Sequence, residues 1–531
     1  MSTKKQTTFY TALAVGSILL VSLLSLTCLT NFPYVHSDES WLAGLTRSMM
    51  EEKSPAATEY FFDAKLRYPH GIKIFFHLLQ MAAISVFGYQ VFSVRLVSWL
   101  AGAGTLWLCY LAGSRLFQSP RKGLFIMALF SVDIQFLYAS HFARQEILLS
   151  LIQWFCLWNL FSEKGFYNNK TACILGTATG LSIGLHPNSF LLGTMNGLCF
   201  LLAYLFTRRK KGTLRPLLLY VLITGGFALL FVSFSLMMDN GFLTHYFAYG
   251  QKEFGTGAPL WEKLGGFFGF LKRLYQRNSG TYYLPDLRPQ FFLFGLSGCL
   301  TGAISIFMRK EIPVLAKKAS LLAAGCAGVI SGMIVIGRYN QTSILFLFPF
   351  GYLALVMALE LFEGKLKKGL GILLFFTILF LTLIQVLPEI KKTDYEHYRQ
   401  QIQNLIPENA KVLGNLNIEF FMEYGCLRDY RNLPYALEGE GLLAYLERNE
   451  IEYIVYHQEL DYLWDHRPYY NVIYGNVMFV EELKNYCQNH CEKVGSFQNS
   501  RYGIRVSEIL DQEEYGQVTV YRRASSSSSL K

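Results

Sequence analysis

Long runs of apolar residues alternate with short polar segments along most of this 531-residue chain. The runs at residues 10–30, 214–236 and 370–387 approach or exceed the roughly 18 to 20 residues that a helix needs to cross a bilayer. Their centres carry no charge, and several further runs follow the same pattern. Apolar side chains make up 52% of the chain and charged ones only 16%, which is unusual for a soluble domain. The pattern predicts a polytopic α-helical membrane protein.

The first apolar run follows Lys4 and Lys5, as the apolar part of a secretory signal peptide would. The run is long, however, and no cleavage site built of small residues follows it. We therefore expect it to stay in the protein as a membrane anchor.

Basic residues gather in short segments between the apolar runs, as in loops on the cytoplasmic side of a membrane. Counting them predicts about 11 spans with a cytoplasmic N-terminus. The cytoplasmic loops then hold Arg115, Arg121 and Lys122; Lys164 and Lys170; Arg208, Arg209, Lys210, Lys211 and Arg215; Arg309, Lys310, Lys317 and Lys318; and Lys365, Lys367 and Lys368. The outer segments are the first outer loop 31–73, the turns at 141–146, 186–188 and 337–341, the long outer loop 239–290, and the chain after residue 388.

The apolar stretch at residues 72–88 decides the side on which the following loops lie. If this stretch crosses the membrane, the count gains one span and everything from residue 92 on changes side. Lys73 and His77 can keep their polar groups hydrated if the stretch lies in the interface instead. We predict a helix at the outer interface.

The net charge of +10 does not indicate a nucleic-acid partner, because the basic residues mark loops rather than one helix face. Ten cysteines are scattered along the chain, and those inside predicted spans are expected to be small packing residues. Cys426, Cys487 and Cys491 lie in the tail, where an outer location permits a disulfide that the spacing does not establish.

The composition becomes charged and aromatic from residue 389 on. Short β-like runs at 411–414, 453–457 and 518–521 are interspersed with helix-like segments such as 438–448. We expect a membrane domain over residues 1–388 and a small extracytoplasmic α/β domain over 389–531, with a disordered end at Ser525–Ser529.

Two adjacent carboxylates, Asp38 and Glu39, lie just after the first predicted span. A carboxylate at the outer membrane surface can act as a general base, deprotonating an acceptor hydroxyl or amine as it attacks a sugar. The alternative is a solvated loop or a helix N-terminus, where the helix dipole favours acidic residues. These two residues alone leave both interpretations open.

The outer turn at 141–146 places Arg144 and Glu146 between two short spans. Charges so close to hydrocarbon are costly unless they are paired or hydrated, so the two residues are expected to face a polar cavity or to extend from helix ends into the interface. Asp133 lies within the preceding span. It is either a functional group or a structural partner of a neighbouring polar group.

Cationic and hydrogen-bond-donating residues occupy the other outer segments and could together hold a phosphate. Each of them alone is equally compatible with an interfacial anchor. The candidates are Arg67, His70, Lys73, Arg144, His186, Arg338 and Tyr339. Polar groups from four separate outer segments reach the same membrane level, whereas the cytoplasmic loops carry mostly Lys and Arg. This asymmetry favours an outward-facing site.

The order of these features resembles the GT-C superfamily of lipid-sugar-dependent glycosyltransferases, in the branch of protein O-mannosyltransferases and bacterial aminoarabinose transferases of lipid A. Asp38-Glu39 resembles the acidic motif in that branch's first outer loop, and Arg144-Gln145-Glu146 resembles its second acidic motif. Residues 67–73, Arg-Tyr-Pro-His-Gly-Ile-Lys, stand where the branch has a basic-Pro motif, with His70 or Lys73 in place of the usual Lys-Pro pair. Further similar segments are 92–98, 115–117, 181–192, 338–349 and, in the tail, 406–413.

The resemblance implies an inverting transfer, in which an acceptor attacks the anomeric carbon of a sugar while polyprenyl phosphate departs. Asp38 would be the catalytic base, with Glu39 and Glu146 as further acidic residues of the site. The partners would be a polyprenyl-phosphate-linked sugar donor, membrane lipids, and a lipid, glycan or protein acceptor on the outer side of a plasma or inner membrane. Some members of the superfamily use a divalent metal, but no dense carboxylate set is evident here, so no metal ligand is predicted and metal dependence stays open.

Two other classes of protein fit parts of the pattern. A transporter or lipid flippase also has many spans, but it predicts ionisable residues near the bilayer midplane and broken helices, whereas most charges here lie at the outer ends. Asp133 is the main feature in its favour, and no internal repeat supports it. A non-catalytic assembly protein would use the tail to hold a partner and would give the clustered outer residues no common purpose.

Overall fold

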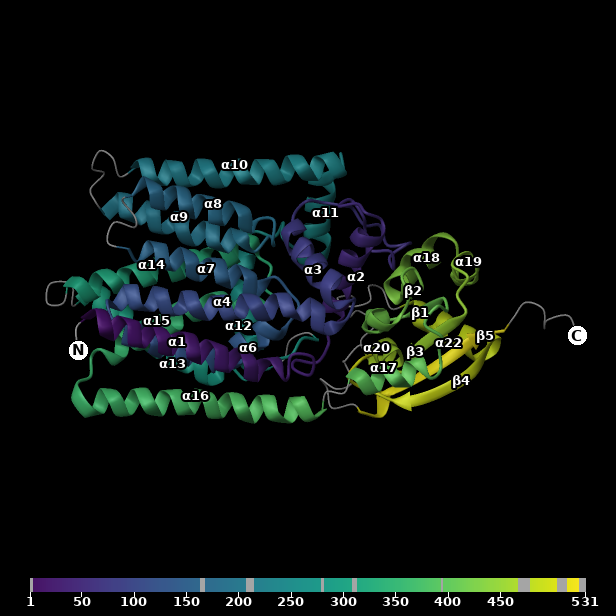
Figure 1. Ribbon diagram of the computed structural model, residues 1–531. Coiled ribbons are helices and arrows are strands. Elements are labelled where there is room, and N and C mark those ends of the chain that lie inside the picture. The colour runs from purple at the N-terminus through teal and green to yellow at the C-terminus, as the bar shows by residue number, and fades with distance from the viewer. Residues whose placement is uncertain are drawn as a thin grey trace, which may run out of the picture.

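The computed structural model describes residues 3–162, 168–206, 214–277, 281–307, 313–392, 395–466, 478–503 and 513–524. A bundle of long, roughly parallel helices is followed by a small sheet domain at one end of the bundle (Figure 1). The basic clusters predicted at Lys164, at 208–211 and at 309–310 lie outside the described residues, as does the serine run at 525–529.

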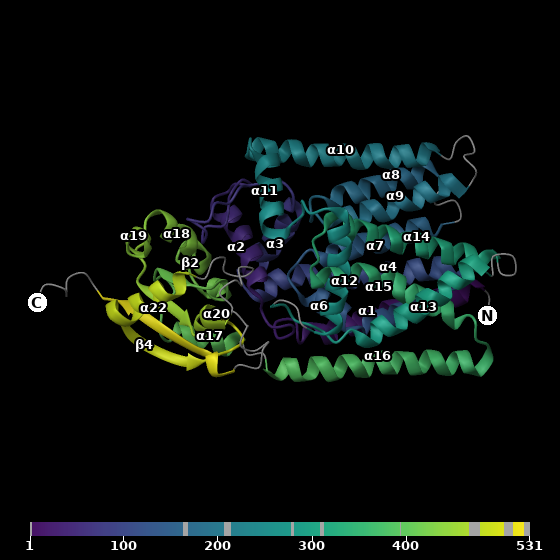
Figure 2. The same cartoon turned by 180° about the vertical axis from the view of Figure 1, so that it is seen from behind.

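The bundle contains most of the helices of the chain. In chain order they are α1 (Thr3–Leu26), α4 (Val91–Phe117), α5 (Pro120–Ser131), α6 (Ile134–His141), α7 (Glu146–Leu160), α8 (Asn169–Ser182), α9 (Ser189–Phe206), α10 (Leu214–Met238), α13 (Arg288–Phe307), α14 (Pro313–Ile336), α15 (Phe348–Leu359) and α16 (Gly364–Lys392). The helices α10 and α16 form opposite edges of the bundle in both views (Figures 1 and 2).

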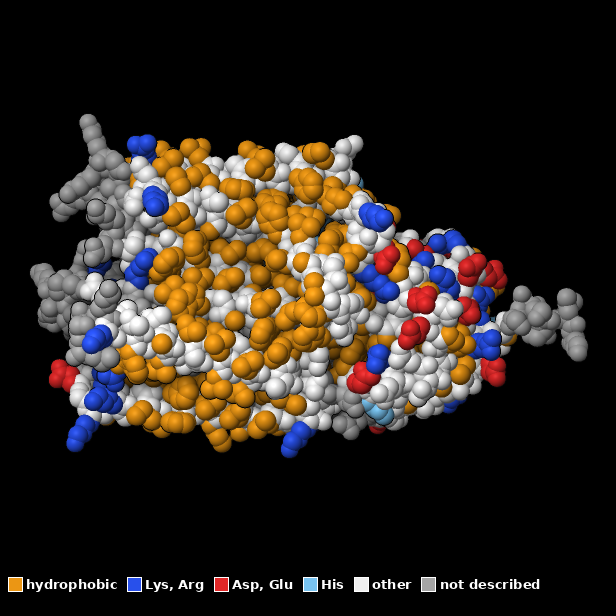
Figure 3. Space-filling view, viewed as in Figure 1, with side chains coloured by type: hydrophobic (Ala, Val, Ile, Leu, Met, Phe, Trp, Pro, Cys, Tyr) orange, Lys and Arg blue, Asp and Glu red, His pale blue; other side chains and the backbone are white. Residues whose placement is uncertain are grey.

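Apolar side chains cover the outside of the bundle. Figure 3 shows them as a broad band, with Lys and Arg at the end near the N-terminus and charges of both signs on the sheet domain. Among the described residues, six helices are long and apolar enough to cross a membrane, or seven if the bent pair α5 and α6 forms one span. Other apolar helices, such as α7, are shorter. The predicted count of about 11 spans is therefore not confirmed and stays a prediction.

Among the described residues before the C-terminal domain, four helices lie outside this set of bundle helices: α2 (Ser37–Glu51), α3 (Ile74–Phe87), α11 (Phe242–Phe254) and α12 (Leu260–Tyr275). Both ribbon views place α2, α3 and α11 at the end of the bundle beside the sheet domain (Figures 1 and 2). The helix α3 corresponds to the predicted interfacial segment and has 14 residues. At a rise of 1.5 Å per residue it is about 21 Å long, which is shorter than the hydrocarbon core of about 30 Å.

The helices α5 and α6 are bent by 69° at a break that contains Asp133. The carboxylate of Asp133 caps α6, because its Oδ1 accepts hydrogen bonds from the backbone N–H groups of Gln135 (2.8 Å) and Phe136 (3.2 Å). Its Oδ2 accepts from the Tyr352 hydroxyl (2.6 Å) and the Gln290 amide (3.0 Å). Both oxygens are thus engaged, so the structure supports the structural role of Asp133 over a transport role.

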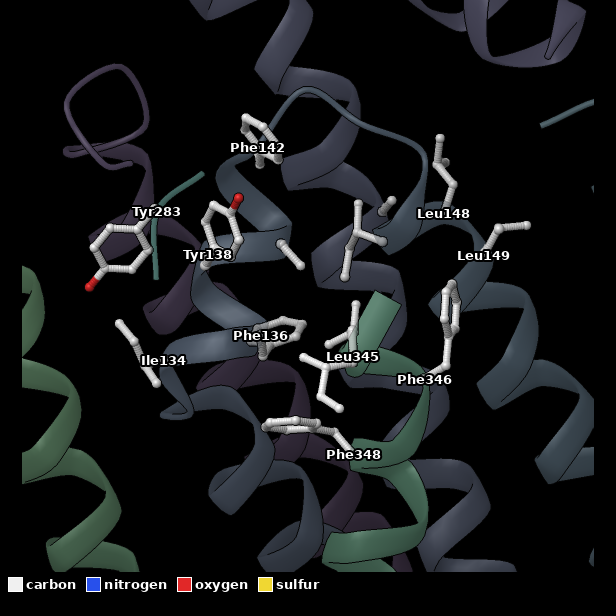
Figure 4. Close-up of a cluster of buried hydrophobic side chains, with 14 of the residues drawn as sticks. Ile134, Phe136, Tyr138, Phe142, Leu148, Leu149, Tyr283, Leu345, Phe346 and Phe348 are labelled. Carbon is white, nitrogen blue, oxygen red and sulfur yellow. The ribbon is translucent and has the colours of Figure 1, made fainter. Parts of the chain in front are cut away.

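Apolar side chains fix the helix α6 and the turn that follows it. Ile134, Phe136 and Tyr138 of α6 pack with Leu345 and Phe348, which come from the 3-10 helix η2 (Gln341–Leu347) and from α15 (Figure 4). The turn between Phe142 and Leu148 runs along the top of this cluster (Figure 4). The cluster therefore holds the backbone of the turn that carries Arg144 and Glu146.

The C-terminal domain contains a five-stranded sheet of order β2-β1-β3-β5-β4. Its strands are β1 (Val412–Gly414), β2 (Leu427–Asp429), β3 (Tyr453–His457), β4 (Cys491–Gln498) and β5 (Gln517–Arg523), and its helices are α17 (Tyr395–Gln403), α18 (Leu433–Gly439), α19 (Leu442–Arg448), α20 (Glu459–His466) and α22 (Phe479–His490). Strand β1 pairs in parallel with β2 and β3, whereas β5 pairs antiparallel with β3 and β4. The predicted small α/β domain is confirmed.

Two details of this domain differ from the sequence prediction. The helix predicted at 438–448 is interrupted at Gly441, whose φ of +84° ends α18 and starts α19. The strands β2 and β4 were not predicted, because β2 has three residues and β4 presents mostly exposed polar side chains. All ten cysteines are free thiols, so the structure contains no disulfide in the tail.

The sheet domain is docked on the first outer loop through main-chain hydrogen bonds. The Asn432 side chain accepts from the N–H groups of Ala64 and Lys65 (both 3.2 Å) and donates to the Phe61 carbonyl (2.7 Å). Phe61 in turn packs on α2 at Gly44, where an added Cβ would lie 2.5 Å from the Phe61 ring. Contacts to the main chain leave little freedom in how the domain sits on the loop.

We predict that Asp133→Ala lowers the stability of the protein by about 2 to 4 kcal/mol, because it removes a cap and leaves buried donors without an acceptor. Asp133→Asn should cost much less, because an amide caps a helix nearly as well and the Tyr352 hydroxyl can also accept. Thermal unfolding of the purified protein in detergent measures both variants. Equal losses for the alanine and asparagine variants would contradict the capping role.

Candidate active site

The first turn of α2 sets the directions of the two adjacent carboxylates. His36 is the N-cap, and its Nδ1 accepts from the backbone N–H of Asp38 (3.0 Å), while Glu39 accepts from the backbone N–H of His36 (3.1 Å). Neighbouring residues on a helix point in different directions. The Glu39 side chain consequently lies in the core at 0% exposure, whereas that of Asp38 is 27% exposed.

Glu39 forms a buried ion pair with Arg95 of α4. The guanidinium donates from Nε to Oε1 (2.8 Å) and from Nη2 to Oε2 (2.7 Å), and both side chains are fully buried. Glu39 also accepts from the backbone N–H of Ala143 (2.9 Å), and Arg95 donates to the carbonyls of Leu29 and Pro33 (both 2.9 Å). These contacts join α2, α4, the end of the first span and the 142–145 turn at one point.

Asp38 and Glu146 are bridged by Arg144. The Nη1 atom of Arg144 lies 2.5 Å from Asp38 Oδ2, and its Nη2 atom lies 3.2 Å from Glu146 Oε1. The hydroxyl of Tyr282, from the long outer loop, donates to Asp38 Oδ2 and accepts from Arg144 (2.5 Å). The structure thus brings together three of the residues that the sequence singled out and adds Tyr282, which sequence reasoning missed.

Charged neighbours keep Asp38 ionised. Burial opposes its ionisation, but the Arg144 guanidinium, helped by His36 and Tyr282, lowers the pKa of Asp38 to about 2. The ring of Tyr282 stacks on His36 at 4.4 Å between centroids, and His36 also contacts the Thr281 hydroxyl (2.9 Å). His36 and Tyr282 therefore hold the Asp38 carboxylate in a fixed environment.

Cationic residues from three segments gather around Lys73, and one of them, Arg144, contacts Asp38. Lys73 is close enough to Arg338, Arg67 and Arg144 for burial and their charges to lower the pKa of Lys73 to about 8. Lys73 adopts a φ of +84° at the N-cap of α3, a backbone conformation that is uncommon for lysine. Strained backbone conformations of this kind often occur at functional sites. A concentration of positive charge around a half-buried ammonium is the expected environment of a bound anion.

Arg67 is held by Glu59 on the side of the site near Trp41. Its guanidinium binds the Glu59 carboxylate in a bidentate manner (3.0 and 2.9 Å), and the Trp41 indole donates to the same carboxylate (2.5 Å). Although burial opposes ionisation, the Arg67 charge lowers the pKa of Glu59 to about 2. Glu59 had no sequence signal, because single acidic residues in loops are common.

Two further predicted residues, His186 and His70, lie close to Lys73. His186 is buried in the turn between α8 and α9, where its Nδ1 accepts from the Asn188 N–H (3.0 Å) and it faces the charges of Lys73 and Arg338. The His70 ring packs beside Phe242 of α11, and burial together with the Lys73 and Arg67 charges lowers the pKa of His70 to about 4.

Tyr339 lies apart from this group. Its hydroxyl donates to the Lys263 carbonyl of α12, and its ring stacks on Phe270 of the same helix at 5.7 Å. The next residue, Asn340, instead approaches the site, because its amide lies 3.4 Å from the Tyr282 hydroxyl. Tyr339 therefore anchors α12 and does not reach the Asp38 group.

Several buried polar atoms at this site have no hydrogen-bond partner among the residues that the structure describes. They are Arg144 Nε, both amide atoms of Gln145, Glu146 Oε2 and Gln341 Nε2. Buried polar groups in native proteins are nearly always satisfied, so a group of them marks a place for a polar ligand or for water.

The carboxylates of the site do not form an open cation site. Over the described ranges, no group of three or more His, Cys, Asp or Glu side chains could hold a metal ion. The Asp38 and Glu146 carboxylates are bridged by the Arg144 guanidinium. Any metal between these two carboxylates would have to displace that guanidinium.

No family model and no curated sequence matches the chain. Among solved structures, it is similar to ArnT from Cupriavidus metallidurans bound to undecaprenyl phosphate, with a TM-score of 0.55 and 14% identity over 98% of this chain and 99% of the other. The apo form of the same protein gives 0.52 and 12% over 97% and 98%. The apo oligosaccharyltransferase of Archaeoglobus fulgidus gives 0.49 and 13% over 84% and 70%.

The chain is a membrane protein with the GT-C fold. The match extends over nearly the whole chain, so the fold includes the sheet domain as well as the bundle. In this structure Arg144 holds Asp38 and Glu146 at one place.

We predict that Arg95→Met destabilises the protein by about 3 to 5 kcal/mol, because it leaves the Glu39 carboxylate buried without a counter-charge. Combining it with Glu39→Leu should recover part of the loss, since the uncompensated charge disappears. Thermal unfolding in detergent reports both effects. The control is Arg399→Ala, which breaks an exposed pair with Glu396 and should cost about 1 kcal/mol or less. If Arg95→Met unfolds like that control, the pair does not hold the site together.

Proposed function

We propose that this protein is a glycosyltransferase that moves a sugar from a polyprenyl-phosphate carrier to an extracytoplasmic lipid, glycan or protein, with inversion at the anomeric carbon and Asp38 as the general base. The observation that carries this proposal is one site in which a partly exposed, ionised carboxylate lies beside a group of cations that includes Lys73. The similar fold of ArnT, whose structure was determined with undecaprenyl phosphate, supports a lipid-phosphate carrier.

The environment of Asp38 defines when it acts in the reaction. Its Oδ2 is held by Arg144 and Tyr282, so Oδ1 is the oxygen that receives the proton of the acceptor. A carboxylate with a pKa of about 2 is a weak base. It therefore removes the proton only as the new glycosidic bond forms and the acceptor oxygen becomes acidic.

The cation group stabilises the leaving phosphate. As the bond between the anomeric carbon and the phosphate oxygen breaks, negative charge grows on polyprenyl phosphate. Lys73 and Arg338 lie close to each other, with His186 beside them, and preorganised positive groups such as the first two stabilise this charge without rearrangement. The charge of Arg67 is matched by Glu59, and the Glu59 carboxylate orients both Arg67 and Trp41.

The other acidic residues have positioning roles in this proposal. Glu39 fixes the start of α2 through Arg95, and Glu146 holds the second side of Arg144 while its Oε1 accepts from the Thr342 hydroxyl (2.7 Å). The transporter alternative loses its main support, because Asp133 is fully engaged in capping α6 and in contacts to α13 and α15.

We expect Asp38→Asn to reduce transfer by about 100-fold or more, because an amide cannot accept the proton of the acceptor. Membranes of a deletion strain that carry each variant would be assayed by mass spectrometry for the surface-glycan modification that the wild-type gene restores. Glu51→Gln, at the exposed end of the same helix, is the matched control and should leave transfer unchanged. Undiminished transfer by the Asp38→Asn protein would remove Asp38 from the mechanism.

Binding of undecaprenyl phosphate should weaken as the pH rises through about 8, because Lys73 then loses the charge that attracts the phosphate. Lys73→Arg should move this decline to higher pH, since a guanidinium stays protonated there. Calorimetric titration of the protein in detergent measures the affinity at each pH. Lys493→Arg, at an exposed position in the sheet domain, serves as the control. A decline that is identical in the Lys73→Arg protein would exclude Lys73 as its cause.

A further inference from the structure

The sheet domain places an arginine against the helix that carries Asp38. Arg431 belongs to the 3-10 helix η4 (Tyr430–Asn432), which directly follows β2. Its Nε and Nη2 atoms bind the two oxygens of Asp429 (2.7 and 3.2 Å), and Asp429 Oδ1 also accepts from the Arg431 backbone N–H (2.9 Å). This bidentate contact fixes the plane of the guanidinium.

The guanidinium lies over two aromatic rings of the membrane domain. It is 4.7 Å from the ring centroid of Trp41 on α2 and 4.9 Å from that of Phe62 in the first outer loop. Trp41 follows Asp38 by three residues, so the two side chains lie on the same face of α2. Arg431 is correspondingly close enough for its charge to lower the pKa of both His36 and Asp38.

The charged and titratable groups that face Asp38 come from separate parts of the chain. Arg144 comes from the turn after α6, His36 from the start of α2, and Tyr282 from the loop before α13. Among the groups found in the described residues, Arg431 is the contribution of the C-terminal domain.

Docking of the domain does not explain Arg431. The domain is already held by Asn432 on the first outer loop and by the Asp63 carboxylate, which accepts from Tyr445 (2.8 Å) and Asn449 (2.9 Å) and pairs with Arg448 (3.0 Å). A buried arginine–carboxylate pair is rarely more stabilising than apolar side chains of the same size, and an apolar residue could pack on Trp41 equally well. A charge at this position therefore requires a reason other than docking.

We propose that Arg431 is a positioning residue of the transfer site, through which the C-terminal domain fixes the first turns of α2 and supplies positive charge beside the Asp38 carboxylate. This inference rests on the proposed glycosyl transfer. It assigns the domain a direct part in the reaction, because the site is incomplete until the domain is docked.

Two substitutions separate the charge of Arg431 from its packing. Arg431→Lys keeps the charge and Arg431→Met keeps the apolar contact with Trp41. Because the methionine variant leaves Asp429 buried without a partner, the double variant Asp429→Asn/Arg431→Met is made as well, in which the amide retains the cap of η4. Arg448→Met, in the same domain and also at the docking surface, is the matched control.

Transfer is measured in membranes of the deletion strain as described above, alongside the affinity for undecaprenyl phosphate and the thermal unfolding midpoint of each purified protein. We expect transfer to fall about tenfold or more in both methionine variants of Arg431, with unchanged affinity for undecaprenyl phosphate, because small displacements of a reacting group are costly. The lysine variant should retain several times more transfer than the methionine variants, and the Arg448→Met control should match the wild type.

Equal transfer by the lysine and methionine variants, or full transfer by the double variant, would overturn the inference. So would a loss of transfer that follows the unfolding midpoint in all variants, the Arg448→Met control included. Asp38→Asn is assayed in the same series. If Asp38→Asn retains transfer, the proposed function fails. If Asp38→Asn is inactive while the Arg431 variants remain active, only the role of Arg431 fails.

Discussion

The buried ion pair between Glu39 and Arg95 is the contact on which the site depends. It lies where α2, α4, the end of the first span and the 142–145 turn meet, and both of its side chains are fully buried. Because Glu39 points into the core, its neighbour Asp38 must point toward the open side of α2. Glu39 thus stabilises the fold, and in doing so it holds the neighbouring Asp38 carboxylate at the surface of the site.

The remaining charges of the site differ in how far they are compensated. Arg144 is shared by Asp38 and Glu146, and Arg67 is matched by Glu59. In the described parts of the chain, by contrast, no carboxylate lies within ion-pair distance of Lys73, whose charge is opposed by burial and by nearby cations. Such an arrangement costs free energy in the unliganded protein, and a bound phosphate would offset that cost.

The sequence predicted the parts of the site that obey local rules. Asp38, Arg144 and Glu146 were identifiable because charges beside apolar runs need partners, and the membrane fold followed from the apolar runs. Tyr282 and Arg431 were not, because their roles arise from contacts between distant segments: Tyr282 meets Asp38 across 244 positions of the chain. Glu59 was missed because a single acidic residue in a loop gives no signal. The predicted number of about 11 spans stays a prediction, since short and bent helices such as α5 and α6 do not match a window of fixed length.

The C-terminal domain and the membrane domain share one apolar core, which limits how the site can open. Val412 and Val455 of the sheet are buried in the same cluster as Tyr34 and Phe61 of the first outer segment. Separation of the two parts would expose this core and the Glu419 carboxylate, which is fully buried between Arg47 and two tyrosine hydroxyls. Exposure of that much apolar surface costs far more than thermal energy supplies. In the proposed reaction, the acceptor would therefore reach Asp38 while the domain stays docked, with Arg431 in place over Trp41.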